Sequence, residues 1–116
     1  LSNKLEVLRE YSTALITVSK EDIKQFDIQT GETEGIVNYA LSINGIKLAA
    51  FITERADKVK LSLRSTGDFP ANEICKKYFE GGGHRNAAGG QSDEPFETVI
   101  AKFKSILPEY KSLLLQ

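Results

Sequence analysis

The stretch EGGGHRNAAGG, from Glu80 to Gly90, contains the residues of this sequence best suited to chemistry. Five of its eleven residues are glycine, and it holds the only histidine of the chain, His84, followed by Arg85. Glycine allows positive φ and close approach to a ligand, so peptide N–H groups can surround an anion. Arg85 offers a fork of donors that matches phosphate, and His84 can donate one or two hydrogen bonds. We expect a loop here that binds a phosphate-like anion.

Two common phosphate-binding patterns do not fit this stretch. A P-loop requires Gly, four residues and then Gly-Lys-Ser/Thr, which no register supplies. A dinucleotide fingerprint requires a third glycine where Asn86 stands, and a strand rather than a helix before it. A structural alternative is that Gly81–Gly83 ends the preceding helix and Gly89–Gly90 forms a turn. One glycine suffices to end a helix, so three glycines followed by His-Arg favour the binding interpretation.

Arg64 is a second candidate for anion binding. It lies at the C-terminal end of an expected strand, where α/β sheets tend to place ligand groups. From Lys58 to Gly90 the chain carries six cations and three acids, a local charge of +3 against −4 for the remainder. This distribution favours an anionic ligand near the glycines. The alternative is a chance imbalance on a solvated surface.

The sequence predicts neither a catalytic nor a metal-binding residue in this chain. It has one histidine and one cysteine, without zinc-ligand spacing or a dense carboxylate cluster. No nucleophile–base pair is recognisable, and Cys75 lies on the apolar stripe of an expected helix. A single cysteine cannot form an internal disulfide, which favours a reducing, cytoplasmic location. No apolar run approaches the roughly 20 residues that span a bilayer, so we expect no membrane association.

The hydrophobic pattern predicts the scaffold that positions these residues. At 116 residues, 41% of them hydrophobic, the chain suits a single domain. We expect an α/β fold, with a small mixed β-sheet flanked by helices. Leu5–Glu10 is interpreted as either a short helix or the start of a strand, and Asp27–Gly35 as a loop. Strands are predicted at 11–19, 46–53 and 58–65, and helices at 20–26, 36–43, 70–79 and 95–107.

Two local patterns support this scaffold. Ser19 and Asp22 have the spacing of a capping box at the start of the helix over 20–26. The strand over 58–65 alternates, with Val59, Leu61 and Leu63 expected to face the core. The opposite face is then expected to carry Lys58, Lys60, Ser62 and Arg64.

Three segments together resemble a known family. They are EGIVNYALSI (Glu34–Ile43), VKLSLRS (Val59–Ser65) and GGGHRNAAGG (Gly81–Gly90), in that order. They resemble the C-terminal DHH-associated domain of DHH phosphoesterases, over most of the chain. The resemblance is strongest to the branch of bacterial oligoribonucleases that are also 3′-phosphoadenosine-5′-phosphate phosphatases.

The resemblance implies a substrate-binding role for particular residues. In the family, an N-terminal domain carries an Asp-His-His motif with two manganese ions, and the C-terminal domain grips the substrate. By resemblance, Gly82, Gly83 and His84 would contact the terminal phosphate or nucleotide. Arg64, with Ser65 beside it, would hold another phosphate or the sugar–base portion. Asn38 and Arg85 are further candidates from the same motifs.

The sequence contains no Asp-His-His motif, so the resemblance implies that catalysis belongs to a missing domain. We expect residues 1–10 to be a linker or the end of that catalytic domain, and residues 11–116 to be the substrate-binding domain, inactive alone. Manganese would be bound by the missing domain, with no cofactor in this chain. Expected partners are a short single-stranded oligonucleotide or nucleoside bisphosphate, the N-terminal DHH domain, and a second copy of the parent protein in a homodimer. The alternative is a stand-alone nucleic-acid or nucleotide-binding module, because a related domain occurs in alanyl-tRNA synthetase.

Overall fold

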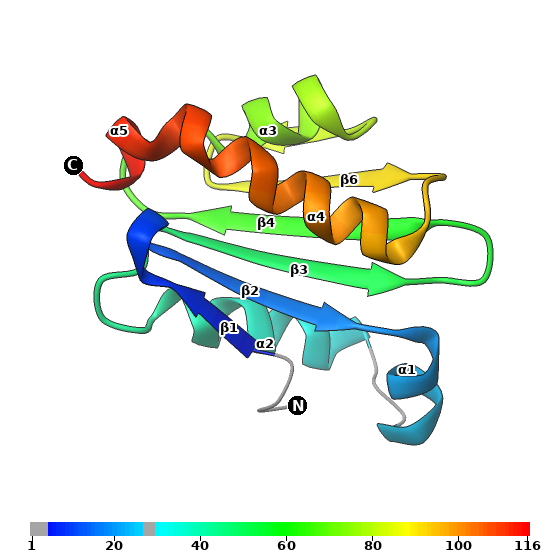
Figure 1. The fold of residues 1–116 in the computed structure, drawn as a ribbon. Coiled ribbons are helices and arrows are strands. Elements are labelled where there is room, and N and C mark those ends of the chain that lie inside the picture. Colours follow the sequence, from blue (N-terminus) through cyan, green and yellow to red (C-terminus); the bar gives the residue numbers. More distant parts are fainter. Residues whose placement is uncertain (1–4, 27–29) are drawn as a thin grey trace.

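The computed structural model of the protein describes residues 5–26 and 30–116, which form one six-stranded sheet with helices on both faces (Figure 1). The strand order is β1-β2-β3-β4-β6-β5. Only β2 and β3 pair in parallel, and all other neighbours are antiparallel, so the predicted mixed sheet is confirmed. The strands are β1 (Leu5–Leu8), β2 (Thr13–Val18), β3 (Leu48–Glu54), β4 (Val59–Ser65), β5 (Gly82–His84) and β6 (Ala87–Ser92).

The helices divide between the two faces of the sheet. In Figure 1, α3, α4 and α5 lie on one side of the sheet, and α2 lies on the other. The connection between the parallel strands β2 and β3 contains α1 and α2. No helix in the described ranges is long and apolar enough to cross a membrane. The helices are α1 (Lys20–Phe26), α2 (Thr30–Leu41), α3 (Ala71–Tyr78), α4 (Phe96–Ile106) and α5 (Lys111–Leu114), with short 3-10 turns η2 (Arg9–Tyr11) and η3 (Leu107–Tyr110).

Each face of the sheet has its own hydrophobic core. The larger core joins the sheet to α3, α4 and the C-terminal turns, with Phe79 and Phe103 among its buried side chains. The smaller core joins the sheet to α2 and includes Val37, Ala40 and Phe51. Strand β3 lies between the two cores, which explains why its sequence, LAAFITE, is apolar on both faces.

The alternation predicted for β4 is confirmed. Val59, Leu61 and Leu63 are buried in the larger core, and the residues between them face the other side of the sheet. The predicted capping box of α1 is also confirmed. Ser19 N–H donates to Asp22 Oδ2 at 3.0 Å, and Asp22 N–H donates to Ser19 Oγ at 3.1 Å.

Helix α2 begins earlier than predicted. It starts at Thr30, within the expected loop Asp27–Gly35, of which residues 27–29 lie outside the described residues. The composition of this segment suggested a loop because Gly and Thr have poor helix propensity, but tertiary packing of the helix overrides such weak preferences. The helix ends at Leu41 rather than at residue 43, and Gly45 adopts φ +87° in the following turn.

At the N-terminal end, the strand interpretation holds for Leu5–Leu8, which pairs with β2 as strand β1. Residues 1–4 of the predicted linker lie outside the described residues. At the other end of the sheet, the predicted loop over Glu80–Gly90 is wrong, because this stretch forms a β-hairpin of β5 and β6. The sequence did not predict these two strands, because glycine is among the residues least common in strands.

Candidate functional site

The β5–β6 hairpin brings three of the candidate residues, Arg64, Gly82 and His84, onto one face of the sheet in aligned rows. Arg64 on β4 pairs with Ala87 on β6, which pairs in turn with His84 on β5. Paired residues of neighbouring strands share a face. Neighbouring strands lie about 4.8 Å apart, so Arg64 and His84 flank the small Ala87 side chain from about 10 Å apart.

A second row lies directly beside the first. Ser62 on β4 pairs with Gly89 on β6, which pairs with Gly82 on β5. The middle strand therefore contributes only Ala87 and Gly89 at these positions, and the surface between β4 and the edge strand is hollowed into a shallow furrow. We call this side of β4, β6 and β5, opposite to α3, the open face.

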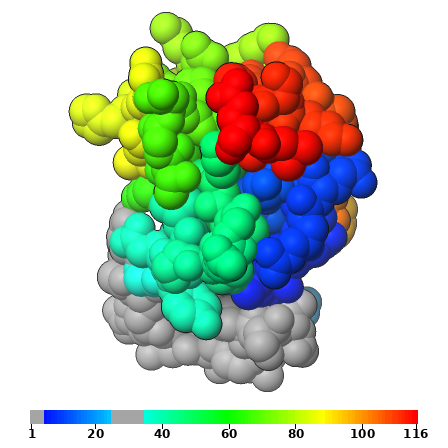
Figure 2. Space-filling view, turned by 90° about the vertical axis from the view of Figure 1, so that its left-hand side faces the viewer, coloured from blue at the N-terminus to red at the C-terminus, as the bar shows by residue number. Residues whose placement is uncertain are grey.

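The open face contains a shallow pocket at the two rows. Its volume is about 260 Å³, and we call it the hairpin pocket. Figure 2 shows the yellow hairpin projecting at the margin of the molecule, beside the green residues of β4 and the loop that follows. Three predicted site residues, Arg64, Gly82 and Gly83, line the hairpin pocket, together with Ser62, Ala87, Ala88 and Gly89.

Most glycines of the hairpin are explained by close packing. A Cβ atom on Gly81 would collide with the carbonyl oxygen of Gly89, and one on Gly90 would lie 2.9 Å from Phe79 Cβ. Gly83 adopts φ +138°, and a Cβ atom there would lie 2.8 Å from the carbonyl oxygen of Ala87. The alternative of a helix stop is wrong. Helix α3 already ends at Tyr78, and its C-cap Phe79 is extended at φ −141°.

Gly82 is different, because the fold does not require a glycine there. A Cβ atom on Gly82 would meet no atom within 4 Å and would extend into open space at the hairpin pocket. Its φ lies outside the left-handed region that disfavours other residues. Because Gly82 has no side chain in this open space, a ligand can approach its backbone closely.

His84 and Arg85 lie at the tip of the hairpin. Both side chains are exposed, and neither lines the hairpin pocket. His84 is nevertheless adjacent to the pocket, because it ends the row that begins at Arg64. Arg85 lies in the two-residue turn, and its Nη1 is 3.7 Å from Asp68 Oδ1 in an exposed ion pair. Exposed pairs of this kind contribute little to stability.

Ser65 and Asn86 hold the hairpin in place. The buried Ser65 hydroxyl donates to the Phe69 carbonyl at 2.8 Å, and Asn86 Nδ2 donates to Ser65 Oγ at 2.9 Å. Asn86 Nδ2 also donates to the Gly67 carbonyl at 3.0 Å. Sequence reasoning missed Asn86, although an Asn in a turn next to a glycine-rich stretch is a recognised signal for such side-chain bonds.

Arg64 and Asn38, two further predicted site residues, have different surroundings. Arg64 is partly buried, and its Nη1 donates to the Leu63 carbonyl at 2.9 Å. Asn38 is exposed on α2, the helix that packs against β3 and β4, and it is not among the residues that line the hairpin pocket.

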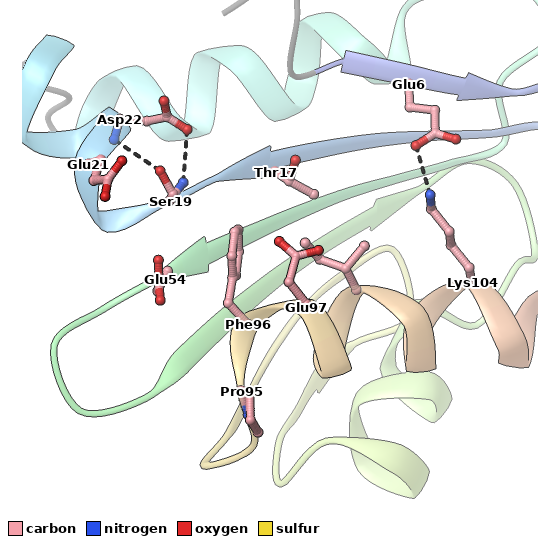
Figure 3. Close-up of a pocket in the computed structure, with 11 residues that line it drawn as sticks. Glu6, Thr17, Ser19, Glu21, Asp22, Glu54, Pro95, Phe96, Glu97 and Lys104 are labelled. Carbon is pink, nitrogen blue, oxygen red and sulfur yellow. Dashed lines mark hydrogen bonds and ion pairs between the residues drawn. The ribbon is translucent and has the colours of Figure 1, made fainter.

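A larger pocket, of about 590 Å³, has the opposite electrostatic character (Figure 3). Several of its carboxylates have structural partners. Glu6 pairs with Lys104 at 2.9 Å, and Glu54 accepts the Lys20 N–H at 3.1 Å. Its acids would repel a phosphate, and it shares no lining residue with the hairpin pocket. The acidic side chains that line it are Glu6, Glu21, Asp22, Glu54 and Glu97.

The described residues offer little for catalysis. Burial raises the pKa of the Cys75 thiol to about 11, so the thiol stays protonated and unreactive at neutral pH. Within the described ranges, no group of three or more His, Cys, Asp or Glu side chains is placed to hold a metal ion. On the open face, by contrast, the donors of Arg64 and His84 beside Gly82 could bind an anion.

Comparison with known proteins identifies the family of this domain. The sequence model of a family described as the DHHA1 domain matches residues 11–112. An exopolyphosphatase-related protein from Bacteroides fragilis has a crystal structure that is 38% identical, with a TM-score of 0.92, and the match covers 99% of this chain and 34% of that one.

Two curated bacterial proteins are also similar. The bifunctional oligoribonuclease and PAP phosphatase NrnA of Bacillus subtilis is 26% identical, over 90% of this chain and 33% of its own length. The probable bifunctional oligoribonuclease and PAP phosphatase NrnA of Streptococcus mutans is 33% identical, over 87% of this chain and 31% of its own length. The chain thus spans about a third of these relatives.

Proposed function

The chain belongs to the DHHA1 domain family, and from this we propose that it is the substrate-binding domain of a DHH phosphoesterase. Its open face would hold the terminal phosphate of a short oligonucleotide or a nucleoside bisphosphate. The observation that carries this proposal is the row formed by Arg64, Ala87 and His84, next to Gly82, whose missing side chain leaves open space at the pocket.

The row supplies suitable donors for a phosphate. Arg64 can donate through its guanidinium, and His84 through its imidazole, from opposite sides of Ala87. The backbone at Gly82 can approach an oxygen closely because no side chain intervenes. The names of the similar proteins, an oligoribonuclease and PAP phosphatase among them, support a phosphate-bearing nucleotide as ligand.

The expected affinity of this site alone is low. A charge-assisted hydrogen bond contributes about 1.5–3 kcal/mol, and association offsets much of that gain. Two or three such bonds therefore correspond to a dissociation constant of about 1 mM. A second domain closing over the ligand would add the contacts that tighter binding requires.

We assign hydrolysis to a DHH catalytic domain outside this sequence. The described residues lack a cluster that fits a metal ion, so the manganese expected for the family would be held by that other domain. This chain would then position the phosphate for attack by orienting it in the furrow. The single, buried Cys75 suits a reducing compartment, and we propose a cytoplasmic location.

A titration of the 116-residue chain tests the binding role. Adenosine 5′-monophosphate and 3′-phosphoadenosine 5′-phosphate are added at low salt while amide chemical shifts are recorded. We expect the largest shifts at Gly82, Gly83 and His84, and a weakening of at least about fivefold in Arg64→Ala and in His84→Ala.

The matched control is Lys76→Ala, because Lys76 is exposed on α3, on the opposite side of the sheet, and its loss changes the net charge equally. This control should bind both ligands as the unaltered chain does. Absence of shifts at millimolar ligand, or affinities unchanged in both the Arg64 and His84 variants, would contradict a phosphate site on the open face.

A further inference from the structure

Ser65 lies on the opposite side of the sheet from the hairpin pocket. It follows Arg64 on β4, where successive side chains point to opposite faces. Its partner on β3 is Leu48, a member of the larger core, and Ser65 itself is 5% exposed. The Ser65 side chain therefore points toward the layer that holds α3, and it does not line the hairpin pocket. Its hydroxyl can influence a ligand on the open face only through other residues.

The Ser65 hydroxyl joins the turn of the hairpin to the larger core. It donates to the Phe69 carbonyl at 2.8 Å and accepts from Asn86 Nδ2 at 2.9 Å. Phe69 is 3% exposed, and its ring makes an edge-to-face contact with the Tyr110 ring, with centroids 5.8 Å apart. Phe69 is thus firmly held in the core, and through Ser65 it restrains the position of Asn86.

The backbone of Ser65 holds the same turn. Ser65 N–H donates to the Asn86 carbonyl at 3.0 Å. The Arg85 carbonyl, which lies 3.3 Å from Ser65 Oγ, is a second and longer acceptor for the hydroxyl proton. Arg85 and Asn86 directly follow His84 in the chain, so these bonds place the end of β5.

His84 depends on this turn more than Arg64 does. Strand β5 is at the edge of the sheet and pairs only with β6, so His84 has one neighbouring strand. Arg64 lies on β4, which pairs with β3 at Ala49 and with β6 at Ala87. Local opening of the turn therefore displaces His84, while Arg64 keeps a neighbouring strand on each side.

We propose that Ser65 is a positioning residue for phosphate binding, whose buried hydroxyl holds His84 opposite Arg64 across the open face. This inference rests on the proposed function, because it gives Ser65 a role in the same phosphate site. Ser65 makes no contact with the ligand and acts through the turn and His84. Its effect on affinity is therefore part of the effect of His84, and it disappears when the His84 side chain is removed.

The test is a double-mutant cycle on the 116-residue chain with adenosine 5′-monophosphate as ligand. We expect Ser65→Ala to weaken binding about threefold, because His84 is no longer held in place. In the His84→Ala background, the same substitution should change the affinity less than about 1.5-fold. In the Arg64→Ala background it should again weaken binding about threefold, because His84 still contributes there.

Three further variants separate positioning from a general loss of stability. Ser65→Thr keeps the hydroxyl, so it should bind within about 1.5-fold of the unaltered chain. Asn86→Ala removes the same hydrogen bond from an exposed position, so it should repeat the cycle if a Ser65 variant fails to fold. The matched control is Ser92→Ala. Ser92 is a buried serine that pairs with Val59, at the far end of β6 from Ala87, and its Oγ accepts the Glu94 N–H at 3.1 Å. This control should lower the midpoint of urea denaturation and leave the affinity unchanged.

The imidazole signals of His84 provide an independent readout. Adenosine 5′-monophosphate should shift them in the unaltered chain. At equal saturation, the shift should be less than about half as large in Ser65→Ala, because the ring is no longer held beside the phosphate. The ligand-induced shift of Arg64 Nε–H should keep its size.

The outcomes separate this inference from the proposed function. Three results would each overturn the positioning role while leaving the phosphate site intact. They are an unchanged affinity in both Ser65→Ala and Asn86→Ala, an equal loss with and without His84, and an equal loss in Ser92→Ala. If adenosine 5′-monophosphate binds equally well to Arg64→Ala, His84→Ala and the unaltered chain, the proposed function itself fails.

Discussion

At the scale of single residues, four of the five glycines between Gly81 and Gly90 separate into two kinds, while a Cβ atom on Gly89 would make an ordinary contact, 3.4 Å from the Leu61 carbonyl oxygen. Gly81, Gly83 and Gly90 are required by the fold, because a Cβ atom at each would collide with neighbouring atoms. Gly82 has open space where its Cβ atom would lie. The absence of a side chain at Gly82 is therefore better explained by what approaches the sheet from outside.

This difference predicts opposite effects for two alanine substitutions. Gly82→Ala should leave the free energy of unfolding unchanged or raise it by about 0.4–1 kcal/mol. Alanine can adopt the φ of this position, and it lowers the conformational entropy of the unfolded chain. The substitution should also weaken binding of adenosine 5′-monophosphate, because the new methyl group enters the hairpin pocket. Urea denaturation and the ligand titration measure the two effects on the same sample.

Gly90→Ala is the matched comparison in the same hairpin. Its Cβ atom would lie 2.9 Å from Phe79 Cβ and from the Phe79 carbonyl oxygen, so we expect a loss of about 1–3 kcal/mol. A destabilised Gly82→Ala, or an undiminished affinity in that variant, would show that the residue serves the fold and not the ligand.

At the scale of elements, the hairpin depends on a polar anchor at its turn. The Arg85 carbonyl accepts the N–H of Ala71 at 2.8 Å, which ties the turn to the start of α3. Asn86 Nδ2 donates to Ser65 Oγ and to the Gly67 carbonyl, which ties the turn to the end of β4. These bonds fix β5 relative to β4, and so they set the row that joins Arg64 to His84.

Asn86→Ala should loosen the hairpin without unfolding the sheet. Two hydrogen bonds are lost, one of them to the buried Ser65, so we expect a loss of about 1–2 kcal/mol. Amide hydrogen exchange should accelerate in β5 and β6 more than in β2 and β3. The control is Asn44→Ala, because among the described residues Asn44 takes part in one hydrogen bond, in which its backbone carbonyl accepts from Arg9 Nη1. Exchange that accelerates evenly over all strands would contradict a local anchor.

At the scale of the whole molecule, one sheet is shared by two cores. Phe51 belongs to the core under α2, and Phe103 belongs to the core under α3 and α4. Strand β3 contributes to both, because Phe51 and Ile52 point to opposite faces. The two layers are therefore coupled through the strands between them, and we expect them to unfold together.

Phe51→Ala and Phe103→Ala should each lower the free energy of unfolding by about 3–5 kcal/mol, because each residue is nearly or fully buried. Both should shift one common transition, so circular dichroism and tyrosine fluorescence should give coincident curves in urea. Tyr39→Ala is the control, since its side chain is 69% exposed, and its effect should stay within about 0.5 kcal/mol. Two separate transitions would show that the faces are independent.

Local patterns in the sequence were sufficient for several features. The alternation of β4 identified the face that carries Lys60, Ser62 and Arg64, because the side-chain direction of a strand depends only on its period of two. The capping box of α1 was equally readable, because its bonds join residues three positions apart.

Other features depended on contacts between distant residues. The hairpin was not predicted, because its glycines carry no side-chain pattern and form strands only through the pairing of β6 with β4 and of β5 with β6. The rows across the sheet could not be predicted either, because Arg64 and Ala87 become neighbours only through the register of β4 and β6. Ser65 shows the limit most clearly: its hydroxyl bonds with Asn86, a partner 21 residues away. The sequence by itself determined which residues could bind an anion, whereas tertiary pairing decided that Arg64, Gly82 and His84 share one face.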